Sequence, residues 1–261
     1  MIRVGYYQFR PRFGDTGGNC RKIVKRLRDV DADLMVLPEL PFTGYLFSGR
    51  RELAALAEEP RKSPIVDSLV ALCRERRMHI VTGFAEKAGD KIFNSALLLG
   101  PRGIRHVYRK LHLFNLEKRW FDPGDTPLAV QRVRGTRIGI MICFDWVFPE
   151  VTRALAVQGM DLLCHPSDLV LDYCQGVMLS RSVENGIFTV TANRFGDDRR
   201  PHGRVRFSGK SQITGPRGEL IQRAPSQREV LHVETLDPRR ARDKKITPKN
   251  DLIRDRRPEF Y

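Results

Sequence analysis

Three residues whose side chains could carry out covalent catalysis lie at or just past the ends of predicted strands: Glu39, Lys110 and Cys143. A cysteine thiolate attacks electrophilic carbon, a carboxylate can take the thiol proton, and an ammonium can stabilise the developing anion. Together they could form and hydrolyse a thioester or thioimidate without a metal or other cofactor. Taken singly, each has an ordinary interpretation as a core thiol or a solvated charge.

The nucleophile candidate lies where an apolar run changes abruptly into a polar, proline-marked segment. Gly139-Ile140-Met141-Ile142 precedes Cys143, and Phe144-Asp145-Trp146 follows it. This pattern predicts a buried strand that ends in a sharp strand-to-helix turn, the geometry of a nucleophile elbow. The backbone N–H of Phe144 would then complete an oxyanion site beside the Cys143 thiol.

The general-base candidate Glu39 follows the short apolar run 33–37 and lies between Pro38 and Pro41. Ligand crevices in layered α/β proteins open at the carboxyl ends of strands. The position therefore predicts that the Glu39 carboxylate faces a binding site.

A cysteine–histidine arrangement is an alternative that the residue types leave open. Cys143 could pair with His165, oriented by Asp145 or Asp168, as in a catalytic triad. His112 is a second candidate partner for the thiol.

Strand and helix signals alternate along the whole chain, which predicts an α/β protein. We expect strands at 2–9, 33–37, 79–86, 91–99, 104–108, 128–133, 136–142, 161–166, 186–193, 209–214, 219–223 and 229–235. We expect helices at 20–30 with Asn19 as N-cap, 50–59, 63–77 with Ser63 as N-cap, 149–158 and 174–185. The basic, glycine-containing stretch between 194 and 208 is interpreted as a loop.

Two internal similarities suggest that the chain has two related halves. The run 33–39 resembles 161–167, and a Gly-Pro-Arg-Gly turn at 100–103 recurs at 215–218. Two such halves would stack their sheets face to face and cover them with helices, giving a four-layer α-β-β-α sandwich. We therefore expect one domain over residues 1–235 and a charged tail over residues 236–261.

Composition narrows the classes of function. The 261 residues carry a formal net charge of +15, but the basic residues are spread along the chain and no nucleic-acid-binding motif accompanies them, so specific nucleic-acid binding is not expected. There are 5 cysteines, an odd number without a C-x-x-C pair, which argues against a disulfide framework or zinc site. Neither a signal peptide nor a membrane span is visible, so we expect a cytoplasmic protein.

Three segments, in order, resemble the signature motifs of the nitrilase superfamily, the carbon–nitrogen hydrolases. They are Pro38-Glu39-Leu40, Tyr108-Arg109-Lys110-Leu111-His112-Leu113-Phe114, and Gly139-Ile140-Met141-Ile142-Cys143-Phe144-Asp145 with Phe148-Pro149-Glu150. Supporting matches are Glu117, His165-Pro166-Ser167, Arg181-Ser182-Val183-Glu184-Asn185, Thr191-Ala192-Asn193-Arg194 and Gly209-Lys210-Ser211. The resemblance extends over nearly the whole chain.

The resemblance implies the α-β-β-α fold and a catalytic set of Glu39, Lys110 and Cys143. It implies that Glu117 is a second active-site glutamate, which positions substrate or assists proton transfer, and that His112 is a motif residue near the site and not the base. It also implies a homodimer or larger assembly in which the tail packs on a partner subunit.

The reaction implied is thiol-dependent hydrolysis of a small amide or carbamoyl compound to an acid and ammonia through a thioester on Cys143. A nitrilase acting on a small aliphatic nitrile is the alternative, because Cys143-Phe144-Asp145-Trp146 in a short chain also resembles small nitrilases. An acyltransferase is disfavoured because such members of the family carry membrane spans.

A catalytically silent basic binding protein is a further alternative, and the intact set of Glu39, Lys110 and Cys143 argues against it. The residues expected to line the substrate pocket are Tyr45, Phe47, Phe144, Trp146, Leu169 and Asn193.

Overall fold

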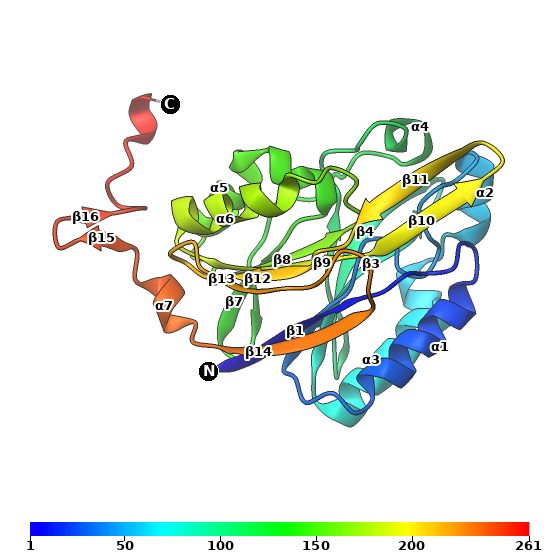
Figure 1. Cartoon of the computed structure of the whole chain (residues 1–261), viewed down its shortest axis with the longest axis horizontal. Helices are drawn as coiled ribbons and strands as arrows, with labels where there is room; N and C mark the ends of the chain where they lie inside the picture. Colours follow the sequence, from blue (N-terminus) through cyan, green and yellow to red (C-terminus); the bar gives the residue numbers. More distant parts are fainter. Residues whose placement is uncertain (261) are drawn as a thin grey trace.

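The computed structural model describes residues 1–260, and Tyr261 at the end of the expected tail lies outside them. Two six-stranded sheets stack face to face in the middle of the molecule (Figure 1). In spatial order, the first contains β14 (Val230–Leu236), β1 (Ile2–Gln8), β2 (Leu34–Val36), β3 (His79–Ala88), β4 (Lys91–Gly100) and β5 (Gly103–Arg109). The second contains β13 (Leu220–Arg223), β12 (Gln212–Thr214), β9 (Phe188–Asn193), β8 (Leu162–Ser167), β7 (Thr136–Ile140) and β6 (Gln131–Val133).

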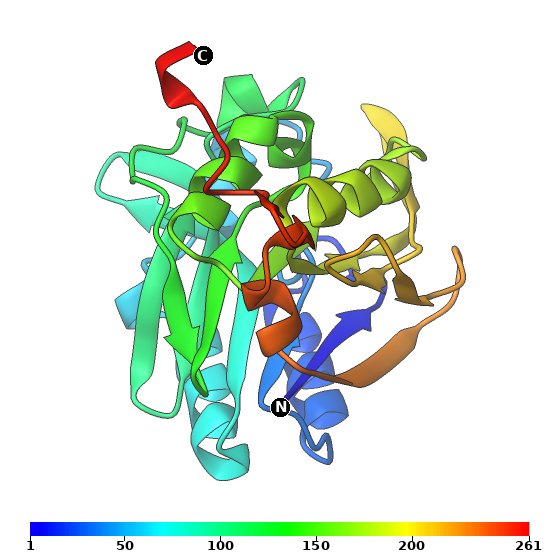
Figure 2. The same ribbon diagram turned by 90° about the vertical axis from the view of Figure 1, so that its left-hand side faces the viewer.

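Helices cover the outer face of each sheet, so the predicted four-layer sandwich is confirmed. The helices α1 (Thr16–Leu27) and α3 (Pro64–Arg76) lie against the first sheet, and α5 (Pro149–Val157) and α6 (Cys174–Asn185) lie against the second (Figures 1 and 2). Shorter elements are α2 (Arg50–Leu56), η1 (Pro60–Lys62), α4 (Glu117–Trp120), η2 (Cys143–Val147) and α7 (Arg239–Arg242). Among residues 1–260, no helix has the length and apolar content needed to cross a membrane.

The layers explain why several strands read as continuous apolar runs. In β2, Leu34 and Val36 pack in the core between the sheets, while Met35 and the following Leu37 pack in the core beneath α1 and α3. Successive strand side chains point to opposite faces, and both faces are covered here, so every position is apolar. The strands β1, β2 and β3 run parallel, as do β7, β8 and β9.

Local signals placed α3 and α6 correctly and α1 incorrectly. Ser63 caps α3 by accepting a hydrogen bond from the Val66 N–H at 3.2 Å, as expected. Asn19, the expected N-cap of α1, instead lies inside the helix, which begins at Thr16 and is capped by Asp15. The Asn19 amide donates to the Phe42 carbonyl at 2.7 Å and so fixes the segment that follows Glu39.

The basic stretch expected to be a loop is a hairpin. Its strands β10 (Phe195–Arg200) and β11 (Gly203–Ser208) pair antiparallel and project from the sandwich beside α2 (Figure 1). Cross-strand charge pairs such as Arg204 with Asp197 support it, and Arg200 bonds to Glu52 of α2 at 2.6 Å. The hairpin therefore packs against the segment that carries Tyr45 and α2.

The C-terminal segment leaves the sandwich after β14. It consists of α7, a small hairpin of β15 (Lys245–Thr247) and β16 (Asn250–Asp251), and η3 (Pro258–Phe260). The helix α7 packs on the core through the buried Ala241, whereas the hairpin and η3 stand apart from the two sheets (Figure 1). Its first part is anchored, because Arg242 bonds to the buried Asp161 at 3.0 Å. Ile246 and Phe260 further along are more than half exposed.

Candidate active site

Cys143 is the first residue of η2, at a sharp turn that follows β7, as the sequence predicts. Its φ of +39° lies in the left-handed region, which is uncommon outside glycine and concentrates at functional sites. The buried Asp145 carboxylate closes the turn by accepting from the Ile142 N–H at 2.9 Å and the Tyr108 hydroxyl at 2.6 Å. These bonds hold the strained backbone of Cys143 in place.

The Glu39 carboxylate is fully buried and every oxygen has a donor. Its Oε1 accepts from Asn94 Nδ2 at 2.6 Å and from Lys110 Nζ at 2.7 Å, while its Oε2 accepts from the Asp168 N–H at 2.9 Å. These bonds fix the carboxylate in one orientation. Glycine at position 83 makes this possible, because a Cβ there would stand 2.6 Å from the Glu39 Cα.

Lys110 bridges the two glutamates. Its ammonium lies 2.7 Å from Glu39 and 2.8 Å from Glu117, and both carboxylates are buried with it. Glu117 also accepts from the Tyr45 hydroxyl at 2.8 Å and from the Phe114 N–H at 2.9 Å. The two glutamates thus fix a buried cation beside the thiol.

The electrostatics of this cluster favour a resting thiol over a thiolate. Burial, together with the nearby Glu39 charge, raises the pKa of Cys143 well above its ordinary value, while Lys110 opposes that rise. Burial would lower the pKa of Lys110, but the charges of Glu117 and Glu39 outweigh it and raise that pKa well above 10.5. Burial also raises the pKa of Glu117. Lys110 therefore stays cationic, and Cys143 needs a base to become nucleophilic.

The histidines are engaged elsewhere, so the geometry gives no support to a cysteine–histidine pair. The ring of His165 contacts the backbone carbonyl of Cys143 through Nε2 at 3.0 Å and Thr191 Oγ1 through Nδ1 at 3.1 Å. Burial lowers the pKa of His165 to about 4, so the ring is neutral at ordinary pH. His112 contacts Asp145 at 2.9 Å and stacks on Phe148. Both rings thus brace the turn around Cys143.

Comparison with known proteins identifies the family. The model of the carbon–nitrogen hydrolase family matches residues 3–245. The chain belongs to this family. It is 39% identical to a nitrilase of Pyrococcus abyssi, covering 100% of this chain and 99% of that protein. It is 34% identical to an (R)-stereoselective amidase of a Pseudomonas species, covering 90% of this chain and 85% of that protein.

A solved amidase structure has the same fold. The crystal structure of an amidase from Nesterenkonia superposes on this carbon–nitrogen hydrolase with a TM-score of 0.84 at 26% identity, covering 99% of this chain and 94% of that chain. The sheets and helices that position Glu39, Lys110 and Cys143 are therefore those of a known hydrolase fold.

The cavity at the nucleophile is small and largely apolar. Its lining residues are Cys143, Phe114, Phe144, Trp146, Asp168, Leu169, Val170 and Leu171, and its volume is about 10 Å³. Phe144, Trp146 and Leu169, three of the predicted pocket residues, thus lie beside Cys143, and their contact with substrate stays a prediction. Tyr45 contacts the site through its bond to Glu117.

Asn193 lies behind the cavity wall. Its Oδ1 accepts from the Leu169 N–H at 2.9 Å and its Nδ2 donates to the Gly209 carbonyl at 2.6 Å, so both ends of the buried amide are used within the protein. The predicted substrate contact of Asn193 stays a prediction, and in the structure its side chain holds Leu169, which lines the cavity.

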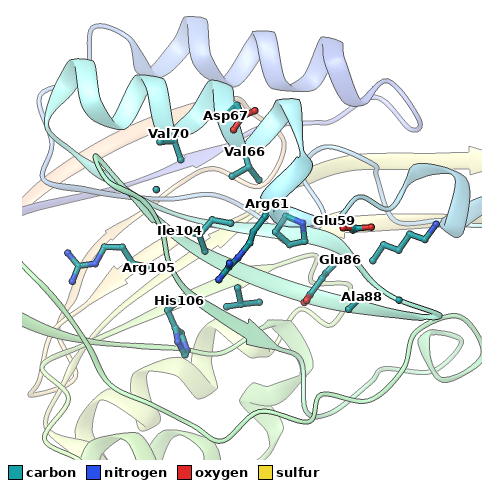
Figure 3. A pocket seen from close by; sticks show the side chains of 15 residues that line it. Glu59, Arg61, Val66, Asp67, Val70, Glu86, Ala88, Ile104, Arg105 and His106 are labelled. Atoms are coloured by element: carbon teal, nitrogen blue, oxygen red, sulfur yellow. The ribbon is translucent and has the colours of Figure 1, made fainter.

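A much larger hollow of about 690 Å³ lies on the outer side of the first sheet, between α3 and β5 (Figure 3). Its labelled lining includes Arg61, Asp67, Arg105 and His106. Its lining residues, as far as the structure describes them, include none of the predicted catalytic set of this carbon–nitrogen hydrolase. The predicted nucleophile Cys143 therefore lines the small buried cavity and not the larger hollow.

Sequence reasoning missed two contributors to the site. Asn94 in β4 donates to Glu39, and Gly83 in β3 gives the Glu39 backbone its room. Each lies within an ordinary strand pattern that carries no signal of catalysis. Within residues 1–260, no group of three or more histidine, cysteine, aspartate or glutamate side chains has the arrangement of a metal site.

Proposed function

We propose that this protein hydrolyses the carbon–nitrogen bond of a small amide or carbamoyl compound to an acid and ammonia, through a thioester on Cys143. The observation that carries the proposal is the buried cluster in which Glu39 and Glu117 hold Lys110 beside the thiol. Such a cluster supplies a base, a cation and a nucleophile within one water-poor cavity.

In the first half-reaction, Glu39 takes the Cys143 proton as Sγ bonds to the carbonyl carbon. The electron pair of the C=O bond moves to oxygen, where the Lys110 ammonium and the Phe144 N–H stabilise the anion. The intermediate collapses, the C–N bond breaks, and Glu39 returns the proton to the leaving nitrogen. Ammonia departs and a thioester remains.

In the second half-reaction, Glu39 takes a proton from a water molecule as the oxygen of that water bonds to the thioester carbon. The C–S bond then breaks, and the sulfur recovers its proton from Glu39. Glu117 keeps Lys110 oriented throughout, with Tyr45 fixing the glutamate. At the end of the cycle Cys143 is again a thiol and Glu39 is again a carboxylate, so the site returns to its starting charge.

Nitrile hydrolysis is the second candidate. The similarity to a protein named nitrilase over the full chain favours it. The same thiol would add to the C≡N carbon to give a thioimidate, which two waters convert to acid and ammonia.

Ammonia release from matched panels of small aliphatic amides, N-carbamoyl amines and nitriles tests both candidates. Turnover of amides or carbamoyl compounds supports the main proposal, and turnover of nitriles alone supports the second. No ammonia release from any compound of the three panels, while iodoacetamide still alkylates Cys143, would overturn both candidate functions.

We also propose a homodimer in the cytoplasm, with the tail packed on the partner subunit. The apolar side chains Ile246 and Phe260 of the projecting C-terminal segment are exposed, as are Val157 of α5 and Val183 of α6. The free thiols of the cysteines suit a reducing compartment. Light scattering tests the assembly: the full chain should have twice the monomer mass, and a chain ending at residue 243 should dissociate more readily. A full chain of monomer mass at assay concentrations would refute it.

A further inference from the structure

The Asp168 carboxyl is a polar group that the reaction scheme leaves unused. Its backbone N–H donates to Glu39, but among residues 1–260 neither of its side-chain oxygens has a hydrogen-bond partner. The side chain is fully buried, and the residue lines the cavity that contains Cys143. A buried acceptor left unpaired is costly, and native sites of this kind are usually completed by water or a ligand.

Arg194 forms a long ion pair with Asp168 but donates no hydrogen bond to it. Arg194 Nη1 stands 4.0 Å from an Asp168 oxygen, beyond hydrogen-bond distance. Both terminal nitrogens of Arg194 instead bond to Asp198, at 3.0 and 2.7 Å, and its guanidinium lies over the Phe207 ring. The charge of Arg194 is therefore shared between Asp198, which accepts both hydrogen bonds, and the more distant Asp168.

The cation of the catalytic cluster is likewise already paired. Lys110 is already paired with both Glu39 and Glu117, so the described residues around the cavity hold three carboxyl groups for one ammonium, and that ammonium is engaged. Burying several acids with one cation favours a ligand that donates hydrogen bonds and carries positive charge.

We propose that Asp168 binds the ammonium group of the substrate, and that the preferred substrates are short amides carrying a primary amine, such as ω-amino amides. This inference rests on the proposed function, because it names the substrate class of the same site. Burial raises the pKa of Asp168 and so disfavours its ionised form, and a bound ammonium would favour that form through its positive charge.

The test compares kcat/KM for matched pairs that differ by one amine: propanamide with 3-aminopropanamide, and butanamide with 4-aminobutanamide. We expect the wild-type enzyme to prefer the amino amide in at least one pair by about tenfold or more, as a charge-assisted bond in a buried site provides. The preference should lie mainly in KM, because the ammonium is held in the ground state as well as in the transition state.

Asp168→Asn should reduce that ratio to near one or invert it, because the amide keeps the shape of the side chain but removes the charge. Asp172→Asn is the matched control, since Asp172 lies on the same loop, is exposed and loses the same charge. It should leave the ratio unchanged. Should Asp168→Asn fail to fold, Asp168→Glu, which displaces the carboxyl, should lower the ratio.

Wild-type turnover of amides without any preference for the amino members would overturn this inference and leave the proposed function standing. An equal drop of the ratio in Asp172→Asn and Asp168→Asn would also overturn it, because the effect would then be long-range charge. No turnover of any compound in the panels would overturn the proposed function and this inference together.

Discussion

Replacing Gly83 by alanine should disable the general base without touching a catalytic side chain. A Cβ at position 83 would lie 2.5 Å from the Leu40 nitrogen, 2.6 Å from the Glu39 Cα and 2.7 Å from the Pro38 oxygen. All three are backbone atoms, so none can rotate away. The Gly83 N–H also donates to the Pro38 carbonyl at 3.1 Å, which ties the two segments together.

The size of the effect follows from those distances. Restoring an ordinary 3.4 Å contact to the Leu40 nitrogen requires a displacement of about 0.9 Å, and Leu40 already has a left-handed φ of +42°. A misplacement of about 1 Å can cost roughly 100-fold in rate, so we expect kcat to fall by about that factor. Overpacking should also lower the free energy of unfolding by about 1–3 kcal/mol.

Steady-state ammonia release and thermal unfolding measure the two effects. Gly176→Ala in α6 is the matched control, because a Cβ there meets nothing within 4 Å and alanine favours helix. It should keep its activity and unfold at the same or higher temperature. Wild-type kcat in a folded Gly83→Ala enzyme would refute the claim that backbone contact at Gly83 sets the position of Glu39.

Three further predictions concern individual side chains. Cys143→Ala should lose turnover and keep its fold, whereas Cys164→Ala, a change at another buried thiol, should lose stability and keep turnover; the reverse pattern in ammonia release would refute the nucleophile assignment. Glu39→Gln should lower the rate of Cys143 alkylation and of turnover by about 100-fold or more, since base catalysis contributes on that scale; an unchanged rate would remove Glu39 from the base role. Burial lowers the pKa of His165 to about 4, so between about pH 6.5 and 4 the unfolded chain binds a proton at this residue that the folded protein does not. Lowering the pH through that range should therefore lower the free energy of unfolding of the wild type more than that of His165→Asn. Urea titrations that give the same pH dependence for both proteins would contradict this.

Much of the catalytic arrangement could be predicted because strand ends carry strong sequence signals. Apolar runs that stop at Glu39 and Cys143 place both residues at the mouths of β2 and β7, and the topology brings those mouths together. The bond between Glu39 and Lys110 crosses 71 positions of sequence, and it forms because the strands that precede them, β2 and β5, belong to the same sheet.

The errors have physical causes. Gly17 and Gly18 lower the helix propensity of the first turn of α1, so the sequence pattern placed the start of the helix too late and indicated Asn19 as its N-cap. The hairpin of β10 and β11 projects from the sandwich and has little buried face, so its strands lack apolar alternation and are supported by charge pairs such as Arg204 with Asp197. The bond from Asn193 to Gly209 could not be predicted, because only the fold brings these two residues together.

Covalent catalysis by Cys143 can be tested directly by mass spectrometry. The protein is quenched in acid during turnover of a small amide, its mass is measured, and any added group is located by peptide mapping. We expect an added acyl group on the peptide that contains Cys143, and neither adduct nor ammonia from Cys143→Ala. An acyl group on another cysteine such as Cys164, or undiminished ammonia release by Cys143→Ala, would contradict covalent catalysis by Cys143.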